Sequence, residues 1–173
     1  MVRRQPSRFS KSACALLIAA FAGIWILVVE NRALAEDADS GTFVLDFTFD
    51  HPIEAVWDAI TKKTLVDKYY FSPINSDVTQ VGADIYYGPA SKKLIAGTVI
   101  AVEAPHLLKH SFRFAEEADT SKTIVTYALT SDGTQTRLHL EHQGYAAGSQ
   151  GYSDIAGGWP IIINGLKIVL DKK

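Results

Sequence analysis

The chain has 173 residues, of which 47% are hydrophobic and 21% charged, with a formal net charge of −2. After residue 35 there are 18 acidic and 12 basic side chains, a formal charge of −6, and the basic ones are scattered, which excludes the basic stripe that nucleic acids and anionic membrane surfaces require. The only cysteine, Cys14, lies in the N-terminal apolar run, so the rest of the chain excludes disulfides, a thiolate nucleophile and a cysteine metal site.

The first 35 residues have the pattern of an export signal. A basic start precedes an uncharged run over residues 12–29 and then Ala-Leu-Ala at 33–35, a small-x-small site of the kind that signal peptidase cuts. We expect residues 1–35 to be a signal peptide, 36–41 a short linker and 42–173 a single exported domain, which is periplasmic. An uncleaved N-terminal anchor is an alternative, because the run is close in length to a spanning helix. The domain would then face outward from the membrane, and secretion is a further alternative.

The first part of the domain predicts one strand followed by two helices. Residues 43–49 alternate apolar and polar side chains, the period-two pattern of a half-buried strand. His51-Pro52 then ends the strand and starts a helix, in which apolar residues recur at helical spacing over 53–60. A second short helix is expected over 64–71, before Pro73.

The middle of the chain predicts strands alone. Their expected ranges are 78–81, 85–87, 94–103, 107–114, 123–130 and 135–143. The first two flank Gly82-Ala83-Asp84, which predicts a hairpin, and Ser131-Asp132-Gly133-Thr134 predicts a hairpin turn between the last two.

The last part predicts a glycine-rich loop over 144–158 that could close over a site, and then a long helix with Pro160 in its first turn. One apolar stripe of this helix is expected to cover the concave face of the sheet. Ile161 and Ile168, on another flank, are expected to meet the two short helices. Hairpin-connected strands with helices at both ends of the strand set predict the α+β class, with a twisted antiparallel sheet of six to seven strands.

Four strings in this order resemble the SRPBCC superfamily, which includes START domains and Bet v 1-like proteins. They are HPIEAVWDAIT, IAGTVIAVEAPHLLKHSFRF, TRLHLEHQGY and GGWPIIINGLKIVL, within residues 42–171. The most similar branch is the one named after the activator of heat-shock protein 90 ATPase homologue. The resemblance implies a helix-grip fold: two short helices after strand 1, and a long C-terminal helix across the concave face with a cavity beneath it.

The resemblance does not imply one reaction. Members include ligand carriers, cyclases or dehydratases acting on polyketides, and co-chaperones, and they share no universal catalytic motif. An exported protein is not expected to meet ATP-driven chaperones, which argues against a co-chaperone role here.

Strand parity and helix spacing assign a lining to the expected cavity. His110 and His142 fall on faces that carry phenylalanine and leucine, where an imidazole could orient a carbonyl or carboxylate, or could be a packed side chain with a backbone or tyrosine partner. A tyrosine suits a pocket mouth, and ordinary packing is the alternative. The predicted ligand-binding pocket comprises Phe43, Phe47, Tyr69, Tyr87, His110, Phe112, Phe114, Leu138, Leu140, His142, Trp159, Ile162, Leu166 and Val169.

Metal and cofactor sites are not expected. His139 and His142 lie three apart on one strand and so face opposite sides, whereas a zinc site needs three or four convergent ligands.

Three functions remain open. The leading hypothesis is binding of a hydrophobic or amphipathic small molecule between the sheet and the C-terminal helix. The alternative is a cofactor-free cyclase, isomerase or hydrolase with His142 as base and a tyrosine such as Tyr87 as acid. The second alternative is a protein-interaction domain with no open pocket, for a partner that the sequence does not specify. Contact with a membrane is expected only through an uncleaved anchor.

Overall fold

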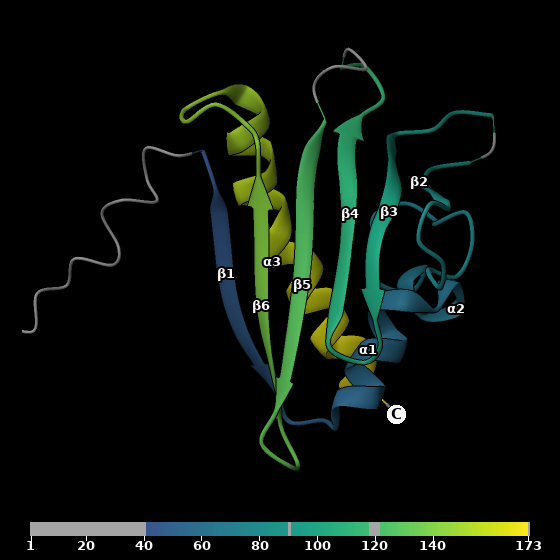
Figure 1. Ribbon diagram of the computed structural model, residues 1–173, viewed down its shortest axis with the longest axis vertical. Coiled ribbons are helices and arrows are strands. Elements are labelled where there is room, and N and C mark those ends of the chain that lie inside the picture. The colour runs from purple at the N-terminus through teal and green to yellow at the C-terminus, as the bar shows by residue number, and fades with distance from the viewer. Residues whose placement is uncertain (1–40, 90, 118–121, 173) are drawn as a thin grey trace, which may run out of the picture. The chain divides into compact units, whose positions relative to one another are not determined.

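Six antiparallel strands form one sheet in the spatial order β1-β6-β5-β4-β3-β2 (Figure 1). The computed structural model describes residues 41–89, 91–117 and 122–172, so the expected export signal and linker up to residue 40 lie outside it. The predicted α+β helix-grip architecture is confirmed. The strands are β1 (Phe43–Phe49), β2 (Asp84–Tyr87), β3 (Ile95–Glu103), β4 (Leu107–Phe114), β5 (Thr123–Ser131) and β6 (Thr136–Gln143), and the helices are α1 (Ile53–Thr61), α2 (Lys63–Val66) and α3 (Gln150–Asp171).

Alternation along the strands gives the sheet one buried face. On β6, Leu138 and Leu140 are fully buried while Arg137 and His139 are exposed, as expected when successive side chains point to opposite faces. The buried face is covered by α3, which runs across the strands on their far side in Figure 1. The sheet and α3 therefore enclose the core between them.

The two short helices follow β1. α1 begins after Pro52, whose fixed φ suits the start of a helix, and it buries Val56 and Ile60. α2 is shorter than the predicted 64–71. The chain leaves it at Asp67, whose Oδ1 accepts a hydrogen bond from the backbone N of Ile74 at 2.9 Å. This bond ties the turn after α2 to the segment that leads to β2.

The prediction of a strand over 78–81 is wrong. Val78 is 4% exposed and its backbone N donates to the carbonyl of Thr61 at 2.8 Å, so this segment is attached to the end of α1. β2 pairs with β3 instead. On the other side of β2, an isolated bridge joins Tyr87 to Ile74, a contact that the turn sequence at 82–84 does not reveal.

The prediction that α3 begins after a loop over 144–158 is also wrong. The helix begins at Gln150, where the Ser149 hydroxyl oxygen accepts from the backbone N of Tyr152 at 3.2 Å, a typical N-cap. Pro160 therefore lies in the helix interior. Ile161 and Ile168 are 74% and 44% exposed, so this flank of α3 lies largely in solvent and is not buried against the short helices as predicted.

Candidate functional site

A small apolar pocket opens where the first half of α3 faces β3 and β4. Its volume is about 40 Å³. A Cβ added at Gly158 would meet no atom within 4 Å, so this glycine leaves the wall open, and Phe71 at the rim is 62% exposed. We call this the sheet–helix pocket; it is lined by Tyr70, Phe71, Ile95, Phe112, Phe114, Asp154, Ile155, Gly158, Trp159 and Ile162.

A larger hollow of about 510 Å³ adjoins this pocket and shares Phe114 and Asp154 with it. We call it the end hollow. The segment before β3, the segment after β4 and the first turn of α3 form its walls, so it carries charges of both signs around an apolar patch. The residues are Lys92, Lys93, Leu94, Phe114, Ala115, Glu116, Glu117, Gln150, Gly151 and Asp154.

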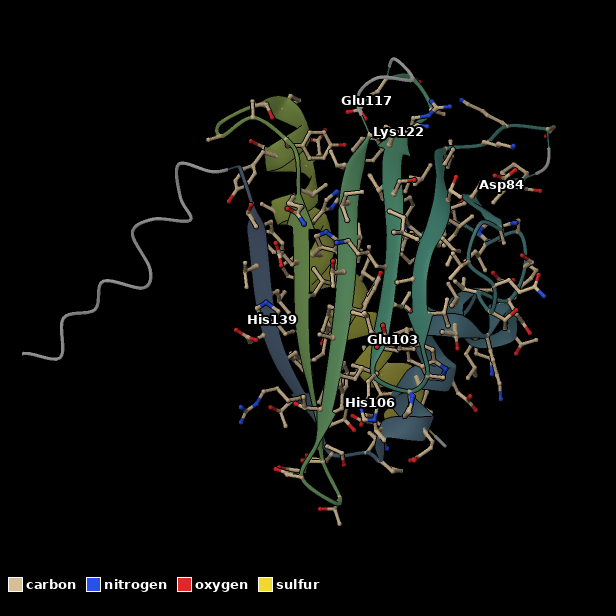
Figure 2. The ribbon with its side chains drawn as sticks, viewed as in Figure 1. Asp84, Glu103, His106, Glu117, Lys122 and His139 are labelled. Carbon is tan, nitrogen blue, oxygen red and sulfur yellow. The ribbon has the colours of Figure 1, made fainter. Side chains whose placement is uncertain are left out.

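Glu117 is held in place at this end of the sheet, where Figure 2 labels it. Its Oε2 accepts from the backbone N of Phe114 at 3.0 Å and from the Tyr145 hydroxyl at 3.2 Å. Glu117 also lines a third hollow, of about 300 Å³, beside the loop before α3. Burial and the neighbouring Glu117 carboxylate raise the pKa of Tyr145 above its usual value, so this phenol stays protonated and donates.

His142 lies at the centre of a buried hydrogen-bond chain. The indole Nε1 of Trp159 donates to His142 Nδ1 at 3.0 Å. Because Nδ1 accepts, the neutral ring carries its proton on Nε2, which lies 2.7 Å from the Thr123 hydroxyl oxygen and donates to it. The Thr123 hydroxyl in turn donates to the carbonyl of Phe112 at 2.9 Å. The chain links α3, β6, β5 and β4.

This arrangement makes His142 a structural residue and a poor general base. Its side chain is 0% exposed, and burial, followed by the nearby His110, lowers its pKa to about 3. Both ring nitrogens are already engaged, so neither has a lone pair free to take a proton from a ligand. Of the two roles weighed for this residue, the geometry supports the packed histidine, although its partners are threonine and tryptophan.

His110 lies across the middle strand from His142, because Val125 of β5 pairs with His110 on one side and with His142 on the other. Its Nδ1 lies 2.9 Å from the carbonyl of Ser111. A carbonyl can only accept, so Nδ1 carries the proton. Burial lowers the pKa of His110 to about 4. This imidazole is therefore neutral near pH 7, and it stacks beside Tyr127 at a centroid distance of 6.1 Å.

Tyrosines gather around the inner side of the sheet–helix pocket. Tyr70 stacks on Tyr87 with ring centroids 4.1 Å apart, and Tyr127 meets Trp159 edge-on at 5.9 Å. The Tyr69 hydroxyl donates to the carbonyl of Ala59 at 3.1 Å. Burial raises the pKa of all four phenols, and the tyrosines' mutual proximity raises it further for Tyr69, Tyr70 and Tyr127.

The predicted pocket residues divide into three groups. Those that line the sheet–helix pocket are Phe112, Phe114, Trp159 and Ile162. Those buried in the core beside it are Tyr87, His110, Leu138, Leu140, His142 and Leu166. Those partly buried at its margins are Phe43, Phe47, Tyr69 and Val169.

Sequence reasoning missed several lining residues, among them Tyr70, Ile95 and Ile155. It also missed Tyr127, although parity with Val125 and Leu129 on β5 was a usable signal.

The outer face of the sheet carries separate features. His139 is exposed and pairs with Asp46 at 2.9 Å, opposite the buried His142 as strand parity predicts. Among the described residues, no three His, Cys, Asp or Glu side chains are grouped so that they could hold a metal ion. None of the helices in the described ranges is long and apolar enough to cross a membrane.

These features define the helix-grip class. They are an antiparallel sheet packed around one long C-terminal helix, two short helices after the first strand, and a pocket under the long helix. Within that class, the chain belongs to the family described as activator of Hsp90 ATPase homolog 1-like protein, whose model matches residues 50–171. The family predicted from the four sequence strings is thereby confirmed.

Solved structures show the same fold. A protein from Mesorhizobium loti superposes with a TM-score of 0.68 at 24% identity, covering 76% of this chain and 98% of its own. An HSP90 activator from Plasmodium falciparum gives 0.65 at 19% identity, with 75% and 96% covered. The Aha1 dimer from Colwellia psychrerythraea gives 0.63 at 16% identity, with 75% and 95% covered. Comparison with curated proteins gives no match.

Proposed function

We propose that the protein binds a hydrophobic or amphipathic small molecule in the sheet–helix pocket, with the ligand's polar end in the end hollow. The observation that supports this most directly is the junction of the two spaces at Phe114 and Asp154. An apolar wall of Phe112, Trp159 and Ile162 thus leads directly to a rim of lysines and carboxylates. Small-molecule sites have this composition: a mostly apolar lining with a few polar groups that orient the ligand.

Entry of a ligand larger than a few atoms requires the rim to open. The sheet–helix pocket alone holds about 40 Å³, whereas ligand sites usually measure roughly 300–1,000 Å³. The end hollow, at about 510 Å³, supplies volume of that order. Phe71 packs on Tyr70 at a centroid distance of 4.8 Å with most of its side chain in solvent, so its ring can swing outward at little loss of buried area. Phe71 is the flap in this proposal.

Two neighbouring glycines of α3 provide a test. Gly158 lines the sheet–helix pocket and Gly157 does not, and a Cβ at either position would meet nothing within 4 Å. Gly158→Leu should fill the pocket and weaken binding of the neutral fluorophore N-phenyl-1-naphthylamine at least about tenfold, or about 1.4 kcal/mol. Gly157→Leu should leave binding within about twofold. Both variants should gain about 0.8–1 kcal/mol of stability from replacing a helical glycine.

The measurement is a fluorescence titration of the purified full chain and both variants. Equal affinities for the two variants would place the fluorophore elsewhere and contradict the proposal. Native mass spectrometry of the wild-type protein, compared with a denatured sample, adds a direct search for a bound molecule released on unfolding.

A second candidate function, contact with a protein partner, is favoured by the exposed isoleucines of α3. Ile161 and Ile168 lie one heptad apart, with exposures of 74% and 44%, and exposed apolar groups at such spacing are typical of helix-mediated contacts. An enzyme with His142 as base has weaker support, because that ring has no free nitrogen.

We also propose that the protein is exported, on the basis of the N-terminal sequence. The basic start, the uncharged run over 12–29 and Ala-Leu-Ala at 33–35 support cleavage after Ala35. Intact-mass analysis of protein recovered from the periplasm of a bacterial host should then give a chain that starts at Glu36. Full-length protein in the membrane fraction would indicate a retained anchor, and full-length protein in the cytosol would contradict export.

A further inference from the structure

Three buried tyrosine hydroxyls beside the sheet–helix pocket have no hydrogen-bond partner within the described part of the chain. They belong to Tyr70, Tyr87 and Tyr127, whose residues are 8%, 5% and 6% exposed. Tyr69 differs, because its hydroxyl donates to the carbonyl of Ala59. Buried hydroxyls normally have partners, so three unpaired ones in one region need an explanation.

These three hydroxyls lie beside the sheet–helix pocket and are not fully sealed from solvent. Within the described residues, every side-chain nitrogen or oxygen that is sealed from solvent has a hydrogen-bond partner. A hydroxyl without a partner is therefore one that solvent can still reach. Tyr70 itself lines the sheet–helix pocket, Tyr87 stacks on Tyr70 at 4.1 Å, and Tyr127 packs against the pocket residue Trp159. Tyr70 therefore lines the pocket, and the rings of Tyr87 and Tyr127 lie directly behind its lining residues.

The chemistry of this region is that of uncharged donors. Burial raises the pKa of each of the three phenols, so each keeps its proton and can donate. The nearest imidazole, His110, is neutral near pH 7 because burial lowers its pKa to about 4. A buried carboxylate would find no cation among these groups, and an unpaired buried charge is strongly unfavourable. An uncharged acceptor meets no such penalty.

We propose that Tyr70, Tyr87 and Tyr127 form a donor subsite at the inner side of the sheet–helix pocket, which binds the uncharged carbonyl of a hydrophobic ligand. This inference rests on the proposed function and narrows its ligand class. The carbonyl lies at the inner end of the ligand, where the phenols donate to its oxygen. The hydrocarbon body lies between Phe112, Trp159 and Ile162, and the polar end proposed above lies in the end hollow.

Three small aromatic compounds of similar size differ mainly in their polar group, so comparing their affinities tests the effect of that group. They are acetophenone, ethylbenzene and benzoate. Dissociation constants come from chemical-shift titrations of the ¹⁵N-labelled full chain. The decisive quantity is the ratio of acetophenone to ethylbenzene affinity in the wild type and in the variant Tyr70→Phe/Tyr87→Phe/Tyr127→Phe. We expect this ratio to fall about tenfold in the variant, with benzoate binding the wild type more weakly than acetophenone.

The variant should fold, because removing an unpaired buried hydroxyl is close to neutral for stability. The matched control is Tyr86→Phe, one residue from Tyr87 on β2 but on the outer face, where Lys93 Nζ lies 4.5 Å from its ring centroid. This control should keep the wild-type ratio.

The outcomes separate the two proposals. One outcome supports the pocket but overturns the donor subsite. In it, ethylbenzene binds the wild type, Gly158→Leu prevents that binding, and the affinity ratio is the same in the triple variant as in the wild type. Benzoate binding more tightly than acetophenone would also overturn the subsite, since it would place the ligand's polar group at Lys92 and Lys93 of the end hollow instead of at the phenols. If none of the probes binds the wild-type protein, both the pocket and its subsite are contradicted.

Discussion

His142→Ala should lower the free energy of unfolding by about 4 kcal/mol. The imidazole is fully buried and bonded at both nitrogens. Its removal leaves a cavity, for which large-to-alanine core substitutions lose about 2–5 kcal/mol. It also leaves the Trp159 indole N–H without an acceptor, which adds about 1–3 kcal/mol when the donor stays buried. Urea denaturation of the full chain measures the change as a shift in midpoint.

Two further variants separate the contribution of the hydrogen bonds of His142 to stability from the contribution of its buried volume. His142→Gln keeps most of the volume and offers an amide oxygen and an amide N–H, so it should lose about half as much stability. His139→Ala, on the outer face of the same strand, removes an exposed hydrogen bond with Asp46 and should change stability by less than about 1 kcal/mol. A loss for His142→Ala no larger than for His139→Ala would show that the buried chain does not hold α3 to the sheet.

The fold was largely predictable because its elements carry strong local signals. Alternation over 43–49 and 135–143 marked β1 and β6, and the same parity puts Leu45 and Leu140, which pair across these strands, on the inward face. The start of α3 was not predictable in this way. Gly151, Gly157 and Gly158 argue for a loop on propensity alone, and the helix forms there because Ile155 and Trp159 are buried against the sheet.

The candidate site was only partly predictable, for a related reason. Strand parity places His110 and His142 on the inner face, but it cannot show that Trp159, on a different element, donates to His142. That contact depends on where α3 crosses the sheet. The rim residue Phe71 also depends on tertiary placement, since it follows a helix that ended earlier than its sequence predicted. Strand parity alone would have placed Tyr127 on the inner face of β5, together with Val125 and Leu129.

Lowering the pH from 7 to 5 should lower the free energy of unfolding by about 3–4 kcal/mol, because His110 and His142 are buried as neutral rings. Their pKa values in the folded protein are about 4 and about 3, against about 6.5 in the unfolded chain. Between these values the unfolded state binds more protons, so stability rises with pH and is lost as the pH falls below about 6.5. Each unit of pH in this window is worth about 1.4 kcal/mol per histidine, and the loss ends only below the folded-state values.

Urea unfolding at half-unit steps from pH 7.5 to 4.5 measures this dependence. His110→Gln and His142→Gln should each remove about half of the loss between pH 7 and 5, because each deletes one proton-binding site from the unfolded state. His139→Gln, exposed on the outer face of β6, should keep the wild-type dependence. If the wild-type protein has a flat profile over this range, the imidazoles gain protons without unfolding. The chain of bonds from Trp159 through His142 to Thr123 would then have to rearrange, because a doubly protonated ring cannot accept at Nδ1.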